Sequence, residues 1–382
     1  LIYRYFVFLI QFFNFSFISI KLGVFNFGIY SFILLFLQYS NSTSLGTEYS
    51  LNIILSSKKR SDRFNSTVFS SGLIILSIIS FLTLIVSYVI LSYDIQIFPK
   101  YSFNKFLIPT ILIAIFWNFN NYYSNIYRVY GKLFEIAFFQ TLIQIVLIPA
   151  ILFFKSDQLL IYLIYFTLIG QFISLVLFMI KSPLNFKFII NKTLIKVILN
   201  RGLFLLFYNL SAGLILLSSK TLVSIFYSVK DMGQFSFANG ISQTAIMGFS
   251  VISFVLFPKL IEKFNASETL NFDVFNRAKT NYFYASYFSI LFVILLLPIL
   301  LLFFEQYEES FKAIVFLLIA QVIFSTSFAH SILLISNKKE FQLGLIAITS
   351  VLFNVILGII LKYVLNLGYE YIAFGNIVTA IF

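Results

Sequence analysis

The sequence predicts an all-α polytopic membrane protein, and two observations support this prediction. Of the 382 residues, 60% are hydrophobic and only 10% are charged, whereas roughly 25% of the residues in soluble proteins are charged. A soluble fold of this size cannot bury so much apolar surface and still present a polar exterior to water. Apolar runs of about 20 residues, the length that crosses a bilayer, recur along the whole chain, as at 71–91 and 284–304. A soluble enzyme is therefore excluded.

The apolar runs and the polar breaks between them predict about twelve transmembrane helices. The runs are continuous, whereas a transmembrane β-barrel would show alternating strands of about ten residues. In chain order the predicted spans are 5–20, 28–55, 68–91, 106–125, 134–154, 159–180, 202–227, 234–257, 282–304, 312–335, 341–365 and an incomplete span from 371. Because the sequence begins with Leu1 rather than Met and stops at Phe382 inside an apolar run, we expect a fragment of a longer chain.

The basic residues predict how the spans are oriented. Most of the 26 Lys and Arg residues fall in alternate loops on one side, and the positive-inside rule makes that side cytoplasmic. The N-terminus is then cytoplasmic as well. The net charge of +12 is explained by this topology and by attraction to anionic lipid headgroups. It does not indicate a nucleic-acid partner.

The chain also contains a short internal repeat. Residues 24–32 (VFNFGIYSF) match residues 229–237 (VKDMGQFSF) at four positions, and each copy enters an even-numbered predicted span. The repeat predicts two pseudo-symmetric bundles of six helices with the same orientation. The first bundle covers 1–200, the second covers 202–382, and a basic loop at 181–201 connects them. Gly28 and Gly233 are expected at the tight turn before each helix, where a positive φ favours glycine.

Two such bundles indicate a transporter whose substrate is held between them, and polar residues inside the spans are candidates to line that cavity. The second span carries Gln38, Asn41 and Glu48 near one stripe, and the eighth carries Ser236, Asn239, Gln243 and Ser250 at similar spacing. The alternative is interhelical packing, in which small and amide side chains join helices. For the asparagines at 118, 120 and 121, anchoring at the membrane interface is the favoured interpretation.

Two charges inside the spans have functional and structural interpretations. Glu48 is costly at membrane depth, so it is either a proton- or cation-coupling site or a buried hydrogen-bonded residue. Lys220 either attracts an anionic substrate such as a pyrophosphate or extends its ammonium to the membrane surface. Arg128 and Lys132 are candidates to guide an anionic headgroup, although topology alone also accounts for them.

No cofactor is expected. The sequence has no Cys and a single His, which excludes thiolate and His-based zinc sites. It also has no P-loop or other nucleotide-binding motif. Uphill transport would therefore draw on a gradient of H⁺ or Na⁺, or on consumption of the product.

Several segments resemble the polysaccharide (O-antigen repeat-unit) flippases of the MATE-like superfamily. Residues 21–30 (KLGVFNFGIY) resemble the outer loop after the first helix of these flippases, and residues 44–49 (SLGTEY) resemble their second helix. Residues 232–240 (MGQFSFANG) are similar to a signature between helices seven and eight. Pro258-Lys-Leu resembles the end of helix eight, and residues 354–369 resemble helix eleven and the loop after it.

The resemblance implies a multi-pass protein of the bacterial cytoplasmic (inner) membrane with a MATE-like fold. Such a protein moves undecaprenyl-pyrophosphate-linked oligosaccharides across that membrane for O-antigen, capsule or exopolysaccharide biosynthesis. The resemblance also implies polysaccharide polymerase and chain-length proteins as partners. One departure is Lys220, at a position where many relatives carry an acidic residue. Three alternatives stay open: an ion-coupled small-molecule exporter with the same fold, a membrane polymerase or glycosyltransferase, and a scramblase or structural partner. The expected outer loops are too short and too poor in charge for catalysis, so we predict that the chain is not an enzyme.

Overall fold

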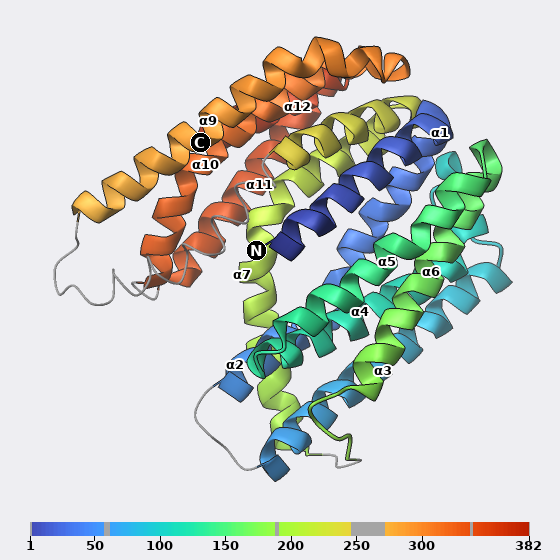
Figure 1. Cartoon of the computed structure of the whole chain (residues 1–382), viewed down its shortest axis with the longest axis vertical. Helices are drawn as coiled ribbons and strands as arrows, with labels where there is room; N and C mark the ends of the chain where they lie inside the picture. The colour runs from blue at the N-terminus through green and yellow to red at the C-terminus, as the bar shows by residue number, and fades with distance from the viewer. Residues whose placement is uncertain (1, 57–61, 188–190, 246–271, 337–338, 382) are drawn as a thin grey trace. The chain divides into compact units, whose positions relative to one another are not determined.

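The computed structural model describes residues 2–56, 62–187, 191–245, 272–336 and 339–381, which are helical apart from short turns (Figure 1). A helix that begins at residue 229 is described as far as 245. Four short 3-10 turns are η1 (Asn41–Ser44), η2 (Pro99–Tyr101), η3 (Phe103–Phe106) and η4 (Glu305–Ser310). The other helices are α1 (Ile2–Ser40), α2 (Thr47–Ser56), α3 (Asp62–Ser92), α4 (Leu107–Val129), α5 (Leu133–Phe153), α6 (Ser156–Ile180), α7 (Lys192–Phe226), α9 (Phe272–Leu302), α10 (Phe311–Ser336), α11 (Glu340–Tyr363) and α12 (Glu370–Ile381).

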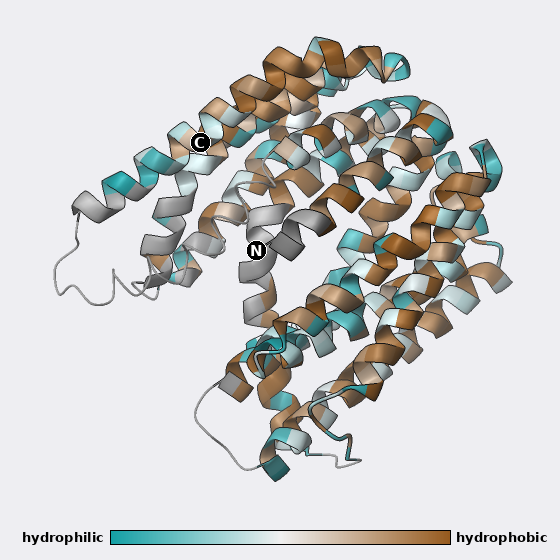
Figure 2. Cartoon of the chain, in the orientation of Figure 1, coloured by the Kyte–Doolittle hydropathy of each residue, from teal (hydrophilic) through white to brown (hydrophobic). Residues whose placement is uncertain are grey.

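The predicted class, an all-α membrane protein, is confirmed. Within the described residues, 7 helical stretches are long and apolar enough to cross a bilayer, and hydrophobic residues dominate such helices in Figure 2. They are Val7–Ser44, Asp62–Ser92, Leu133–Phe153, Ser156–Ile180, Lys279–Leu302, Glu305–Ser327 and Gly344–Tyr363. The predicted total of about twelve spans stays a prediction.

α1 contains the first predicted span and the first part of the second. Its 39 residues would extend about 58 Å as one straight helix, roughly twice the hydrocarbon thickness of a bilayer. The helix instead bends at Gly23, whose backbone has φ 70° and ψ 165°. The sequence located this break, between the predicted spans 5–20 and 28–55, but assigned the turn to the wrong glycine. Gly28 lies within the helix and has no positive φ, and the same holds for Gly233.

The chain forms two compact units. Unit 1 comprises Leu1–Ser31 and Ser211–Phe382, and unit 2 comprises Phe32–Leu210. Both boundaries lie inside helices, one in α1 and one in α7. The last ten residues of the expected loop at 181–201 are helical, because α7 begins at Lys192. The predicted division at 200/202 follows from the internal repeat, whereas the two units are defined by how compactly the chain packs. The two repeated bundles therefore stay a prediction.

The core of unit 2 is aromatic. Tyr122 and Tyr127 of α4 are fully buried, and their hydroxyls donate to the carbonyls of Phe69 (2.7 Å) and Phe178 (3.1 Å). Gly72 of α3 faces the Tyr122 ring so closely that a methyl group there would overlap its hydroxyl. These contacts attach α3 and α6 to α4 and fix the helix that borders the candidate site.

Candidate functional site

The second predicted span is broken in unit 2. After α1 ends at Ser40, the chain forms η1 and then passes through left-handed backbone at Leu45 (φ 52°) and Gly46 (φ 69°) before α2 begins. The prediction of one continuous span over 28–55 was therefore wrong. A break at membrane depth frees backbone groups that need protein or water partners, and discontinuous helices form substrate and ion sites in transporters. We therefore take this break as the centre of the candidate site.

The N-terminal part of α7 covers the break. A methyl group on Gly46 would overlap the carbonyl oxygen of Gly202, and one on Gly202 would lie 2.6 Å from the carbonyl oxygen of Leu45. The two segments thus touch through their backbones, which only residues without a side chain allow. Gly46 is constrained twice, because its positive φ also disfavours any L side chain.

Glu48 lies in the first turn of α2 and is 2% exposed. Its Oε1 accepts a hydrogen bond of 3.0 Å from the hydroxyl of Ser44, whereas Oε2 has no hydrogen-bond partner among the described residues. The positive end of the α2 dipole favours a carboxylate at this position. A buried acceptor without a partner is costly, so Oε2 is suited to receive a proton, a cation or a substrate hydroxyl.

α4 supplies an asparagine face to the broken helix. Asn118 Nδ2 donates to Thr43 Oγ1 at 3.0 Å, and Asn121 Nδ2 donates to Asn41 Oδ1 at 2.8 Å. One turn further, Asn52 Nδ2 donates to Asn125 Oδ1 at 3.4 Å. Asn118 and Asn121 thus bind the broken helix, and the predicted position of these asparagines at the membrane interface stays a prediction. The spacing of Asn118 and Asn121 with Asn125, which places all three on one helix face, was the sequence signal that could have shown this contact.

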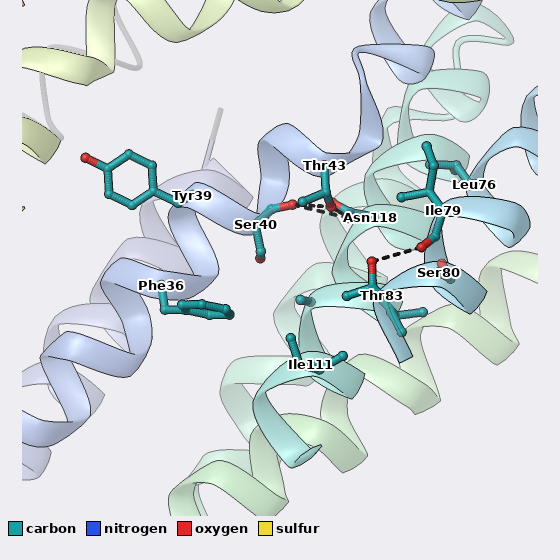
Figure 3. Close-up of a pocket in the computed structure, with 12 residues that line it drawn as sticks. Phe36, Tyr39, Ser40, Thr43, Leu76, Ile79, Ser80, Thr83, Ile111 and Asn118 are labelled. Carbon is teal, nitrogen blue, oxygen red and sulfur yellow. Dashed lines mark hydrogen bonds between the residues drawn. The ribbon is translucent and has the colours of Figure 1, made fainter. Parts of the chain in front are cut away.

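A cavity of about 220 Å³ adjoins the hydrogen bonds of Asn118 (Figure 3). Its polar end contains Ser40, Thr43 and Asn118, and the rest of its wall is mainly apolar. A wider cavity of about 500 Å³ shares Phe36, Thr43, Ile79, Thr83 and Ile111 with it. Unit 2 therefore contains an amphipathic space beside the broken helix.

Lys220 lies in unit 1, within the apolar stretch Leu214–Phe226 of α7, and is half-buried. The neighbouring Ser219 accepts a hydrogen bond of 2.8 Å from Asn354 Nδ2 and donates one of 2.7 Å to Asn376 Oδ1. This network joins α7, α11 and α12. The ion pair found among the described residues, Lys230 with Glu309 at 2.8 Å, does not involve Lys220.

The remaining candidate residues differ in their surroundings. Ser236 and Asn239 are buried, and Asn239 Oδ1 has no hydrogen-bond partner among the described residues, whereas Gln243 is exposed and Ser250 lies outside the described residues. Gln38 is half-buried, and its Oε1 also has no such partner.

Arg128 and Lys132 lie at the end of α4 and in the turn that follows. Arg128 is exposed, and Lys132 Nζ lies 5.7 Å from the centre of the Tyr127 ring. Gln38, Asn41 and Glu48 belong to unit 2 and the other cavity candidates to unit 1, so their convergence on one cavity stays a prediction.

No family model matches the chain, and no curated protein sequence matches it. Solved structures do match. The lipid II flippase MurJ, in an inward closed conformation, aligns with 100% of this chain and 84% of that chain, with a TM-score of 0.80 and 17% identity. An inward-facing multidrug resistance MATE transporter aligns with 98% of this chain and 92% of that chain, with a TM-score of 0.69 and 15% identity.

A third match is a MOP-superfamily transporter from Pyrococcus furiosus. It aligns with 98% of this chain and 89% of that chain, with a TM-score of 0.66 and 15% identity. Identities at this level show a shared fold and no more. These neighbours are transporters rather than enzymes, and the chain has the fold of the MOP superfamily.

Proposed function

We propose that the chain is a flippase that moves undecaprenyl-pyrophosphate-linked oligosaccharide repeat units from the cytoplasmic to the outer leaflet by alternating access. The observation that carries this proposal is Lys220, a half-buried ammonium group in an apolar helix, outside the ion pair found among the described residues. A compact ammonium suits an anionic phosphate group.

The physical problem of flipping fits this arrangement. A pyrophosphate sugar headgroup cannot cross hydrocarbon unaided, because its hydrogen bonds would be lost. Hydrophilic surfaces inside the bundles would replace water around the headgroup, while the polyprenyl tail stays in lipid. The similarity to the lipid II flippase over the whole chain supports a lipid-linked substrate.

The test is a reconstituted flipping assay. The chain is placed in proteoliposomes that contain undecaprenyl-pyrophosphate linked to a fluorescent saccharide, and a membrane-impermeant quencher reports movement between leaflets. We expect Lys220→Ala to lower the initial rate at least tenfold and Lys220→Arg to retain part of it. Lys312→Ala, an exposed lysine at the start of α10, is the matched control. No flipping by the wild-type chain would refute the proposal for this substrate.

A second candidate function is a cation-coupled exporter of small molecules with the same fold. Glu48 favours it, because a buried carboxylate with an unpartnered oxygen suits H⁺ or Na⁺ coupling. The same proteoliposomes distinguish the two candidates. Efflux of a cationic dye driven by an imposed H⁺ or Na⁺ gradient, with no flipping of the lipid-linked saccharide, would favour the exporter.

A further inference from the structure

The two copies of the internal repeat touch each other. A methyl group on Gly28 would overlap the carbonyl oxygen of Val229 and lie 3.0 Å from its Cγ1. A methyl group on Gly233 would overlap the carbonyl oxygen of Val24 and lie 3.1 Å from its Cγ1. Each glycine therefore packs against the valine that begins the other copy, and all four residues belong to unit 1.

This contact is reciprocal in the sense used for symmetric interfaces. Val24 and Val229 are 205 positions apart, and so are Gly28 and Gly233. Val24 of the first copy meets Gly233 of the second, and Val229 of the second copy meets Gly28 of the first. Such an exchange of equivalent residues is the pattern of a local twofold axis. The sequence match and the contact pattern are independent observations, and both identify 24–28 and 229–233 as equivalent segments.

Hydrogen bonds border the contact on the side of the α1 kink. The carbonyls of Ser19 and Ile20, in the turn before Gly23, each accept a bond of 3.1 Å from Gln306 Nε2. The Tyr307 hydroxyl donates to the Ser19 carbonyl at 2.9 Å. These donors come from η4, between α9 and α10. The kink is thus held by hydrogen bonds from η4, of which the bond from Tyr307 is buried.

We propose that the reciprocal glycine–valine contact is the closure of the outer end of the transport pathway, and that Gly28 and Gly233 are the positioning residues that allow it to form. This inference rests on the proposed transport function in one respect, because only a transporter has a pathway that the contact could close. In the predicted bundle division, 24–28 lies in the first bundle and 229–233 in the second. The contact therefore joins the bundles, and the outer end opens only when it separates.

The chemistry of the contact suits repeated opening. Its centre consists of backbone against backbone, and the stacked rings of Phe15 and Phe237, with centroids 5.7 Å apart, pack beside it. The bonds from Gln306 and Tyr307 end on carbonyls, which water also satisfies. A methyl group on either glycine would hold the segments apart without changing a charge. Because the contact is reciprocal, Gly28→Ala and Gly233→Ala should have the same effect.

The absence of Cys in the sequence allows a direct measurement. Phe25 is 57% exposed and the Lys230 side chain 54%, and these repeat-equivalent positions flank the contact. Spin labels on the Phe25→Cys/Lys230→Cys double variant, read by double electron–electron resonance in nanodiscs, should give a short and a long separation. Adding Gly28→Ala or Gly233→Ala should move most of the population to the long separation, whereas Gly344→Ala, whose Cβ would meet nothing within 4 Å, should not. An unchanged single short distance in both alanine variants would overturn the proposal.

A second measurement leaves both glycines in place. A short, reducible bis-methanethiosulfonate joins the same two cysteines, and flipping is measured before and after reduction. We expect at least tenfold inhibition that is reversed by reductant. If the fully cross-linked protein flips the lipid at the wild-type rate, the proposal that this contact closes the pathway is wrong. If the labels show two separations but the wild-type chain flips no lipid-linked saccharide, the proposed substrate fails while the closure stands.

Discussion

The hydroxyl of Ser44 and the carboxylate of Glu48 are joined by a hydrogen bond of 3.0 Å across the break in the second predicted span. Ser44 ends η1 and Glu48 lies in the first turn of α2, so this bond connects the two halves of a discontinuous helix. It satisfies one carboxylate oxygen and leaves Oε2 without a hydrogen-bond partner among the described residues. Oε1 therefore holds the two halves of the helix together, whereas Oε2 is able to bind a proton or a cation.

The first prediction concerns this carboxylate. Glu48→Gln keeps an oxygen that accepts the Ser44 bond but removes the negative charge. We expect a folded, inserted protein whose transport is at least tenfold slower and no longer depends on the imposed H⁺ or Na⁺ gradient. Flux in proteoliposomes with and without the gradient is the measurement. Wild-type flux with unchanged gradient dependence would remove Glu48 from the transport mechanism.

The second prediction concerns the backbone contact over the break. Gly202→Ala places a methyl group 2.6 Å from the Leu45 carbonyl oxygen, and overpacking of this kind costs about 1–3 kcal/mol. We expect a lower apparent Tm in detergent, measured by fluorescence-detected size-exclusion chromatography after heating. Gly344→Ala is the control, because the added carbon meets nothing within 4 Å and alanine favours a helix. Equal Tm values for the two variants would contradict the close approach.

The third prediction concerns the bond that holds the kink of α1. Tyr307→Phe removes the hydroxyl that donates to Ser19 but retains the ring, which is stacked on Phe237 with centroids 4.0 Å apart. We expect a loss of about 1 kcal/mol in unfolding free energy, measured as a shift of the urea midpoint. Tyr363→Phe, at an exposed helix end, should leave the midpoint unchanged. A larger shift of the urea midpoint in Tyr363→Phe than in Tyr307→Phe would show that the bond to Ser19 does not stabilise the fold.

The fourth prediction concerns the polar network of unit 1. Asn354 donates to the Ile215 carbonyl and to the hydroxyls of Ser218 and Ser219. Asn354→Ala would leave these buried groups without that donor, at a cost of roughly 1–3 kcal/mol. We expect a lower apparent Tm together with reduced flipping, because Lys220 follows Ser219 directly. Thr349→Ala is the comparison, because Thr349 is exposed and its hydroxyl donates to carbonyls of its own helix. An equal Tm loss there would count against the network.

The sequence predicted the class of the fold because run length and composition are local properties. A bilayer admits helices whose backbone groups are satisfied internally, so each apolar run could be assigned without knowing its neighbours. The same reasoning located the break between the first two spans, where polar residues interrupt the apolar run. It could not assign the turn to Gly23 rather than Gly28, because a positive φ and a close approach both favour glycine.

The tertiary structure decided what the glycines and asparagines do. Gly28 and Gly233 are helical residues whose missing side chains admit a carbonyl from the other copy of the repeat. Asn118 and Asn121 bind the broken helix. Contacts such as these join residues 75 to 209 positions apart, and their geometry depends on how helices cross. A sequence pattern records the period of a single helix, so it determined the helices here, whereas the packing between helices determined the break, the closure contact and the unpartnered oxygen of Glu48.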